Sequence, residues 1–296
     1  MVKAQRSCLY IPGNNPGMIQ HAPIFGADSV LLDLEDAVAV SEKDAARRLV
    51  SGFISTLDFG DVMVTVRVNG ADTEFFQDDL RAIVPCGPDA VRIPKCSSPD
   101  DVLMADEAIG LIEDGTGMDR GTVKIHAMLE TAVGVQNASS IANCCERVTA
   151  LTLGGQDLTA DMGVRKTREG WELFAARTQV ALAAHAAGID CFDTVWADVN
   201  DNDGLLEETR KVVGLGFTGK AAIHPGQVKW IHKAFVPEEK EIRKAIKVVR
   251  AAEAAEREGK GVVAVDGKMV DAPVVKRARH ILDMARLSGM EEEDLR

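Results

Sequence analysis

Glu130 and Asp157 carry the clearest chemical signal in this sequence. Each follows a short apolar segment, and Asp157 comes directly after Gly154-Gly155-Gln156. If both segments are consecutive parallel strands of a barrel, the two acids face one point at its mouth. Two carboxylates that leave other positions to water and substrate oxygens suit Mg²⁺, whereas no His-rich or Cys-rich spacing would recruit zinc. We therefore predict that Glu130 and Asp157 bind Mg²⁺; alternatively, either acid is an ordinary ion-pair partner at the rim.

Arg67 stands in an otherwise apolar segment and is a candidate for both substrate binding and catalysis. A buried guanidinium needs an anionic partner, and its planar fork matches a carboxylate. That partner is either a substrate carboxylate or a structural acid such as Asp33 or Glu35. Alternation along the strand sends Asp33 and Glu35 to one side, towards a barrel interior. With Asp36 they form either a network behind the metal or the cap of the next helix, and Glu35 is a candidate catalytic residue.

Three further positions have both a chemical and a structural interpretation. Lys95 either neutralises substrate charge, as a substrate-binding residue, or pairs with the acidic cluster. Asp271 precedes Ala-Pro, a common helix-capping arrangement. His224 is more simply a hydrogen-bonded rim histidine than a catalyst.

Eight short, nearly continuous apolar segments alternate with helix signals, as expected of parallel strands buried on both faces. They span residues 7–11, 29–34, 63–68, 90–94, 123–129, 150–154, 190–195 and 219–223. This count predicts an α/β fold of the (β/α)8 barrel type. A doubly wound sheet would instead show a glycine-rich fingerprint after its first strand, where the chain reads Pro12-Gly13-Asn14-Asn15.

The chain changes character after Pro237, which predicts a catalytic barrel at 1–236 and an extension at 237–296. A charged amphipathic helix is expected at 238–258. Asp266-Gly267 between two apolar runs then predicts a hairpin within 261–270, and Asp271-Ala272-Pro273 opens a last helix. An extension added after barrel closure must pack somewhere, and we expect it to pack on a neighbouring subunit.

Charge and composition exclude several classes of protein. The 296 residues include 34 Lys and Arg against 46 Asp and Glu, a formal net charge of −12. A general nucleic-acid binder needs a basic surface, so no nucleic-acid partner is expected. No segment approaches the ~20 apolar residues of a membrane helix, so no membrane partner is expected either. The six cysteines form no Cys-x-x-Cys pair, which indicates reduced thiols and a cytoplasmic location.

Seven motifs follow one another in order along almost the whole chain. They are SCLYIPG at 7–13, LDLEDAV at 32–38, VRVN at 66–69, RIPK at 92–95, LGGQDL at 153–158, GFTGK at 216–220 with IHP at 223–225, and GKMVDAP at 267–273. Together they resemble the citrate lyase beta-subunit family, within the HpcH/HpaI aldolase and malyl-CoA lyase superfamily.

The resemblance implies a (β/α)8 barrel, Mg²⁺ and reversible C–C cleavage of a 3-hydroxyacyl thioester carried by CoA or an acyl-carrier protein. It places Glu130 and Asp157 on the family's metal ligands, with Glu130 close to the substrate. Arg67 falls on the residue that holds the keto-acid carboxylate. Asp271 falls on an acid that related CoA lyases place over a neighbour's active site, where it protonates the acetyl enolate. Relatives of this kind are trimers or hexamers, which implies a homotrimer or hexamer, with citrate lyase alpha and gamma subunits as further partners.

Two departures from the family pattern leave the acyl group open. Gln156 stands where many relatives have Glu, and His224 stands where typical citrate lyase beta subunits often have Asn. The first hypothesis is a citryl-CoA or citryl-carrier lyase that forms an acetyl thioester and oxaloacetate. The second is a malyl-CoA, β-methylmalyl-CoA or citramalyl-CoA lyase. The third is a non-catalytic barrel that binds CoA or a keto acid, although such a binder has no need of a metal pair.

Overall fold

The computed structural model describes residues 5–257 and 263–290. The chain divides into two compact units, Met1–Ile231 and His232–Arg296.

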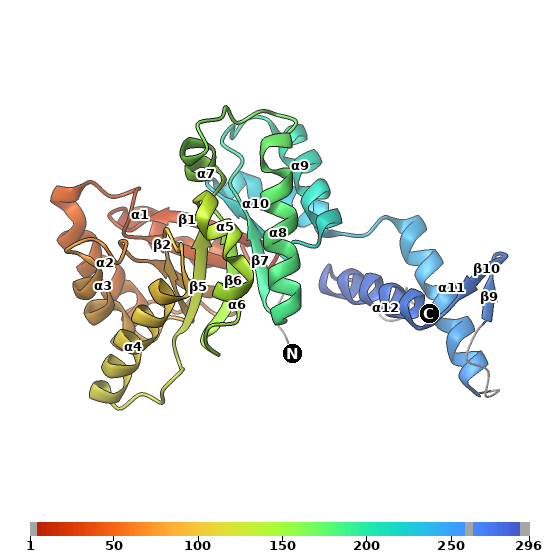
Figure 1. The fold of residues 1–296 in the computed structure, drawn as a ribbon, viewed down its shortest axis with the longest axis horizontal. Coiled ribbons are helices and arrows are strands. Elements are labelled where there is room, and N and C mark those ends of the chain that lie inside the picture. Colours follow the sequence, from red (N-terminus) through yellow and green to blue (C-terminus); the bar gives the residue numbers. More distant parts are fainter. Residues whose placement is uncertain (1–4, 258–262, 291–296) are drawn as a thin grey trace. The chain divides into compact units, whose positions relative to one another are not determined.

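The first unit is a closed barrel of eight parallel strands in which β8 pairs back onto β1 (Figure 1). The strands are β1 (Ser7–Pro12), β2 (Ser29–Asp33), β3 (Met63–Arg67), β4 (Ala90–Ile93), β5 (Lys124–Leu129), β6 (Val148–Leu153), β7 (Asp190–Asp193) and β8 (Gly219–Ala222). All eight expected strands are present, with ends within two residues of the predicted ones. The predicted (β/α)8 barrel is confirmed.

Helices follow the strands and cover the outside of the barrel. They are α1 (Pro16–Ile19), α2 (Lys43–Thr56), α3 (Phe76–Ile83), α4 (Pro99–Thr116), α5 (Ala132–Gln136), α6 (Ala138–Ala142), α7 (Gly155–Asp161), α8 (Trp171–Ala187), α9 (Asn202–Leu215) and α10 (Pro225–Phe235), with 3-10 turns η1 (Ala22–Ile24), η2 (Val40–Glu42) and η3 (Val84–Cys86). Ser98 and Asp101 form the capping box that starts α4. Gly188 ends α8 in the left-handed conformation, with φ of 70°.

Strand register brings polar residues to neighbouring positions inside the barrel. Asp33 pairs with Arg67 between β2 and β3, and Arg67 pairs with Arg92 between β3 and β4. Arg92 in turn pairs with His126 on β5. These paired positions share the inner face, because side chains alternate between the two faces of a strand. Cys8, Leu31, Ala150 and Phe192 form an apolar cluster, against which Tyr10 packs.

A buried charge network joins β7 and β8 to the helices α8 and α9. The Nζ atom of Lys220 lies 2.7 Å from both Asp193 Oδ2 and Glu208 Oε2. Arg177 donates two hydrogen bonds to Asp193 and one, of 2.7 Å, to Glu208. Lys220 and Asp193 are completely buried, so each charge depends on these partners.

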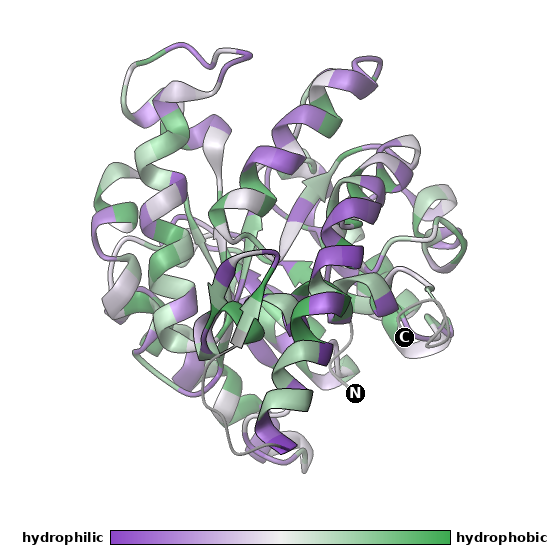
Figure 2. Ribbon diagram, turned by 90° about the vertical axis from the view of Figure 1, so that its right-hand side faces the viewer, coloured by the Kyte–Doolittle hydropathy of each residue, from purple (hydrophilic) through white to green (hydrophobic). Residues whose placement is uncertain are grey.

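The second unit contains α11 (Glu239–Arg257), β9 (Val263–Val265), β10 (Lys268–Val270) and α12 (Ala272–Leu287). Asp266 and Gly267 both have positive φ, 48° and 73°, as the predicted Asp-Gly hairpin turn requires. Residues 258, 261 and 262 of the predicted helix and hairpin lie outside the described residues. The core of the unit packs apolar faces of α11 and α12, including Ile242, Val248 and Leu282. Hydrophilic and hydrophobic residues accordingly alternate along its helices (Figure 2).

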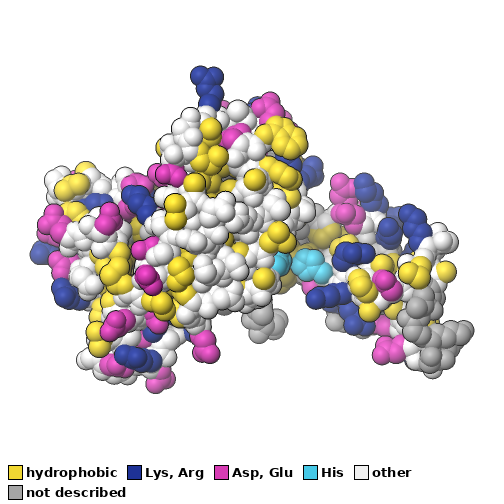
Figure 3. Space-filling model, viewed as in Figure 1, with side chains coloured by type: hydrophobic (Ala, Val, Ile, Leu, Met, Phe, Trp, Pro, Cys, Tyr) yellow, Lys and Arg dark blue, Asp and Glu magenta, His cyan; other side chains and the backbone are white. Residues whose placement is uncertain are grey.

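The described residues also show the distribution of charge, the character of the helices and the state of the cysteines. Basic and acidic side chains are interspersed on the face of the barrel drawn in Figure 3. Within the described ranges, no helix combines the length and hydrophobicity of a transmembrane span. The six cysteines are all free thiols.

Candidate active site

A cavity of about 420 Å³ opens at the carboxyl ends of the barrel strands. Arg67 and Asp157 line it, together with Tyr10 of β1 and Thr194 after β7. Its remaining wall is largely apolar, formed by residues such as Leu153 and Val195. This is the end of the barrel where active sites of the fold occur, because the βα loops gather there.

Arg67 is held by structural acids, as one of its two interpretations predicted. Its Nε and Nη2 atoms donate to the two oxygens of Asp33 at 2.7 and 2.6 Å. Its Nη1 atom lies 2.8 Å from Glu35 Oε2 and 3.7 Å from Asp36 Oδ2. Arg67 and Asp33 are buried, so the pair is fixed in orientation. The fork with Asp33 and the contact with Glu35 occupy three of the five guanidinium N–H donors, and one N–H on Nη1 and one on Nη2 remain for other acceptors.

Lys95 links two acids through different atoms. Its backbone N–H donates to Glu130 Oε1 at 2.7 Å, and its Nζ atom lies 3.0 Å from Glu35 Oε1. Lys95 also has φ of 53°, in the left-handed region that side chains other than glycine rarely adopt. The strained backbone after β4 therefore aims an N–H at Glu130, and the side chain pairs with the acidic cluster as one interpretation predicted.

Glu130 is a buried carboxylate with spare acceptor capacity. Only 1% of its surface is exposed, and its Oε2 atom has no hydrogen-bond partner among the described residues. Burial, followed by the charges of Glu35 and Asp157, raises the pKa of Glu130 to about 8. Such a group is stable as an anion only when a cation approaches, because an unpaired buried charge is costly.

Gly154 makes room for the Glu130 carboxylate at the end of β6. A Cβ atom at position 154 would lie 2.5 Å from Glu130 Cβ and 2.6 Å from its Oε2. The next residue, Gly155, starts α7, and its N–H donates to Thr194 Oγ1 at 3.0 Å. The Gly-Gly pair thus brings the chain against Glu130 and places half-buried Asp157 in the first turn of α7.

The donors at this position fit Mg²⁺. Carboxylate oxygens are the ligands that Mg²⁺ prefers, and the unpartnered Glu130 Oε2 supplies one beside the cavity that Asp157 lines. The described residues contain no group of three or more His, Cys, Asp or Glu side chains arranged to hold a metal. A cation held by the two carboxylates of Glu130 and Asp157 would keep open positions for water and substrate, as Mg²⁺ usually does.

Asp271 lies in the second unit and is the N-cap of α12. Its Oδ1 atom accepts a hydrogen bond of 3.2 Å from Val274 N–H. Asp271 therefore caps a helix of its own chain, as its structural interpretation predicts. Its role over a neighbour's active site stays a prediction. His224 is exposed and accepts a hydrogen bond from Gly226 N–H, which agrees with a rim histidine.

Sequence reasoning missed Tyr10, the only tyrosine in the chain. Its ring lies with its centroid 5.7 Å from the guanidinium carbon of Arg67, and it lines the cavity. Strand alternation offered a signal, since Tyr10 is two residues from Cys8 and therefore shares its inward face.

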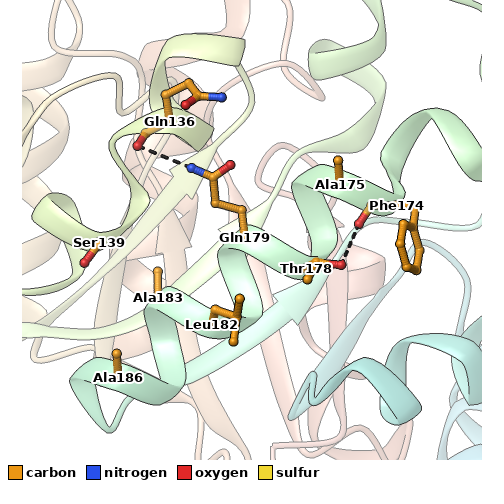
Figure 4. Close-up of a pocket in the computed structure, with 9 residues that line it drawn as sticks. All are labelled: Gln136, Ser139, Phe174, Ala175, Thr178, Gln179, Leu182, Ala183 and Ala186. Atoms are coloured by element: carbon orange, nitrogen blue, oxygen red, sulfur yellow. Dashed lines mark hydrogen bonds between the residues drawn. The ribbon is translucent and has the colours of Figure 1, made fainter.

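A second, larger cavity lies away from these acids. It is a groove of about 550 Å³ between α8 and the α5–α6 segment, where Gln179 donates to the Gln136 carbonyl oxygen (Figure 4). Its lining includes Phe174 and Leu182 but no charged side chain. The groove has apolar character and none of the groups that acid–base chemistry requires.

The chain is similar to proteins of a known family. The HpcH/HpaI aldolase/citrate lyase family model matches residues 6–225. The citrate lyase subunit beta of Leuconostoc mesenteroides subsp. cremoris is 41% identical over 295 residues, covering 99% of this chain and 97% of the relative. A (3S)-malyl-CoA thioesterase of Cereibacter sphaeroides is 38% identical over 281 residues, covering 95% and 94%.

Among solved structures, the fold is similar to that of protein CitE from Mycobacterium tuberculosis in complex with magnesium, acetoacetate and coenzyme A. The TM-score is 0.79 at 31% identity, and the match covers 96% of this chain and 98% of that one.

Proposed function

The chain belongs to the HpcH/HpaI aldolase/citrate lyase family, and on that premise we propose how it acts. It is a Mg²⁺-dependent carbon–carbon lyase that cleaves a citryl thioester to an acetyl thioester and oxaloacetate. The observation that carries this function is the unpartnered, buried oxygen of Glu130 beside a cavity lined by Asp157 and Arg67. Near-complete coverage of a citrate lyase beta subunit at 41% identity supports the citryl group.

Glu130 and Asp157 hold the Mg²⁺ ion in this proposal. The bound ion supplies Lewis-acid stabilisation of the negative charge that develops on the substrate. The raised pKa of Glu130, caused first by burial and then by Glu35 and Asp157, supports a site built to receive a cation. Lys95 N–H holds the second oxygen of Glu130 and so orients the carboxylate.

Arg67 binds the carboxylate of the keto acid with the N–H groups that Asp33 leaves free. Holding the reacting bond in one orientation lowers the entropy cost of reaching the transition state. Glu35, with both oxygens beside the cations of Arg67 and Lys95, acts as a positioning residue for them. The side chain of Lys95 is half exposed and adds a positive charge at the mouth of the barrel.

Asp271 of a neighbouring subunit transfers the proton at the acetyl carbon in this proposal. It gives a proton to the enolate during cleavage and removes one in the reverse direction. This role requires an oligomer, and the family resemblance favours a homotrimer or hexamer. The groove beside α8 and the exposed side chains of Trp171 and Leu182 support contact between copies, since exposed apolar patches mark interfaces.

The thioester carrier is CoA or an acyl-carrier protein, with citrate lyase alpha and gamma subunits as partners in the second case. The relative that binds coenzyme A supports CoA, whereas the citrate lyase subunit supports a complex. Six free cysteines support a cytoplasmic location.

A second candidate is a malyl-CoA-type enzyme, favoured by the 38% identity to a (3S)-malyl-CoA thioesterase. Both candidates need the same metal pair and the same carboxylate-binding arginine, and they differ in the acyl group.

The test is cleavage of a thioester panel with Mg²⁺ and with EDTA. The panel contains citryl-CoA, (S)-malyl-CoA, β-methylmalyl-CoA and both citramalyl-CoA enantiomers, with acetyl-CoA or propionyl-CoA release as readout. We expect Mg²⁺-dependent cleavage of citryl-CoA. Cleavage of malyl-CoA alone would favour the second candidate. No cleavage, including with a citryl-carrier protein and partner subunits, would leave a non-catalytic binder.

A further inference from the structure

Arg92 is a completely buried arginine inside the barrel, on β4 next to Arg67. Its Nη1 atom donates to Tyr10 Oη at 2.8 Å, and its Nη2 atom lies 3.3 Å from His126 Nδ1. Its Nε atom has no hydrogen-bond partner among the described residues. The guanidinium carbon also lies 5.4 Å from the ring centroid of Phe192.

No carboxylate within the described ranges forms an ion pair with Arg92, although each of the other deeply buried arginines, such as Arg147 and Arg177, has at least one. Its polar neighbours are also neutral. Burial raises the pKa of Tyr10, and burial followed by the Arg92 charge lowers the pKa of His126 well below its usual value. Arg92 therefore places a full positive charge in the barrel interior without a compensating anion.

Tyr10 connects this charge to the active-site cavity. It lines the cavity, and its hydroxyl accepts the hydrogen bond from Arg92. Its ring centroid is 5.7 Å from the guanidinium carbons of both Arg67 and Arg92. Two cations thus share one aromatic ring, and only Arg67 is paired with acids.

We propose that Arg92, acting through Tyr10, selects keto acids that carry a second carboxylate. This inference rests on the proposed function, in which Arg67 binds the carboxylate next to the keto group. The second carboxylate of oxaloacetate brings a further negative charge to a cavity already lined by Asp33, Asp36 and Asp157. An unpaired buried cation offsets that repulsion over several ångströms, because water screens charges poorly inside a barrel.

The experiment compares equilibrium binding of oxaloacetate, with two carboxylates, and pyruvate, with one, to the Mg²⁺-loaded protein by calorimetry. The variants are Arg92→Met, which removes the charge at similar length, and Arg92→Lys, which keeps it. Arg48→Met, at an exposed position on α2, is the control for the loss of a positive charge far from the cavity. Thermal unfolding of each variant is measured in parallel.

We expect Arg92→Met to weaken oxaloacetate binding by about tenfold or more and pyruvate binding by less than about threefold, as for loss of one nearby cation. Arg92→Lys should retain most of the preference, and Arg48→Met should match the wild type. Equal weakening of both ligands, or a lower melting temperature with unchanged selectivity, would overturn the proposal.

Two further measurements keep this test independent of folding and of the catalytic claim. If Arg92→Met does not fold, Tyr10→Phe removes the hydroxyl that Arg92 holds and should show the same selective loss on a smaller scale; unchanged selectivity in that variant would refute the proposal. Citryl-CoA cleavage by the wild type tests the proposed function separately. Its failure alongside a charge-dependent oxaloacetate preference would reject the lyase and keep the selectivity role.

Discussion

At the residue scale, the site depends on carboxylates that the protein holds in different electrostatic states. Asp33 is saturated by the Arg67 fork, whereas Glu130 keeps one buried oxygen without a partner. Asp157 is half-buried and reaches the cavity directly. Of these neighbouring acids, Asp33 orients the side chain of Arg67, whereas Glu130 and Asp157 are available to bind a metal ion.

Replacing Glu130 by Gln tests the metal assignment. The amide cannot supply the anionic oxygen, so we expect Mg²⁺-dependent turnover to fall by about 10³-fold or more, typical of losing a charge-stabilising group. Folding should be preserved, since the amide is neutral, as the protonated carboxyl of Glu130 is below about pH 8 in the absence of metal. Steady-state kinetics and thermal unfolding are the measurements, with Glu107→Gln on the exposed surface of α4 as control. Full activity in Glu130→Gln would refute the assignment.

The raised pKa of Glu130 predicts pH-dependent metal binding. Burial, together with Glu35 and Asp157, raises this pKa to about 8, so below that pH Mg²⁺ must displace a proton. We expect the affinity for Mg²⁺ to rise about tenfold per pH unit up to about 8 and then to level off. Calorimetric titration at several pH values in buffers of different ionisation enthalpy measures both affinity and proton release. An affinity independent of pH between 6 and 8 would contradict the raised pKa.

The same shift affects stability without metal. A folded Glu130 keeps its proton up to about pH 8, whereas the unfolded carboxyl loses it near its ordinary pKa of 4.5. The folded state therefore binds more protons over this range, and its free energy of unfolding should decrease as pH rises from 4.5 to 8. Mg²⁺ should reverse that decrease. Urea unfolding with and without Mg²⁺ across this range tests both signs.

At the scale of elements, two βα turns at the mouth of the barrel position the Glu130 side chain. The turn after β4 places Lys95 in a left-handed conformation that directs its N–H at Glu130. The turn after β6 needs Gly154, because any Cβ there would collide with the Glu130 carboxylate. Two turns from different strands thus position one side chain.

Substituting Gly154 by Ala should displace Glu130 while the barrel stays folded. The added Cβ would lie 2.5 Å from Glu130 Cβ, so either the side chain or the turn must shift. We expect weaker Mg²⁺ binding and lower turnover than in the wild type. Gly52→Ala on α2 is the matched control, because its Cβ meets nothing within 4 Å and the change favours helix by up to about 1 kcal/mol. Equal Mg²⁺ affinity in the two variants would show that Gly154 has no such role.

The buried network around Lys220 should contribute to stability. Lys220→Met leaves Asp193 and Glu208 short of a cation in a completely buried position. Breaking a buried pair costs about 3–5 kcal/mol, which urea unfolding can measure. Lys211→Met, which removes an exposed lysine paired with Glu207, should leave the unfolding curve unchanged. A similarly small effect in Lys220→Met would mean that Arg177 alone neutralises both acids.

At the scale of the whole molecule, the proposal divides the catalytic groups between subunits. Arg67 belongs to the barrel and Asp271 to the second unit, where it caps α12. Capping of α12 by itself explains why an aspartate stands at position 271. A role in catalysis therefore needs evidence from more than one copy.

Mixing two inactive variants provides that evidence. Arg67→Ala should weaken binding of the keto acid, and Asp271→Asn should prevent proton transfer while still capping the helix. In mixed oligomers, some sites combine an intact Arg67 with an intact Asp271 from a neighbour, so part of the activity should return. Native mass spectrometry verifies subunit exchange. Absence of recovery after verified exchange would contradict the shared site.

The barrel was predictable because its local signals agree with its global arrangement. Eight apolar segments each form a strand, and Asp266-Gly267 forms the expected hairpin turn. The helix caps are local as well, since Ser98 starts α4 and Gly188 ends α8. Burial on both faces of a parallel strand leaves a continuous apolar signature that no helix of the surface shares.

The sequence by itself determined the barrel, the candidate acids and their place at the strand ends, because periodicity and strand direction are local properties. Only the tertiary structure decided which charged and polar side chains pair with one another. Asp33, rather than Glu35, takes the Arg67 fork, and Tyr10 joins Arg92 to the cavity. These two pairings join residues 34 and 82 positions apart in the sequence, on strands that the closed barrel brings together. Register and closure, which depend on the packing of the whole barrel, therefore set the electrostatics of the site.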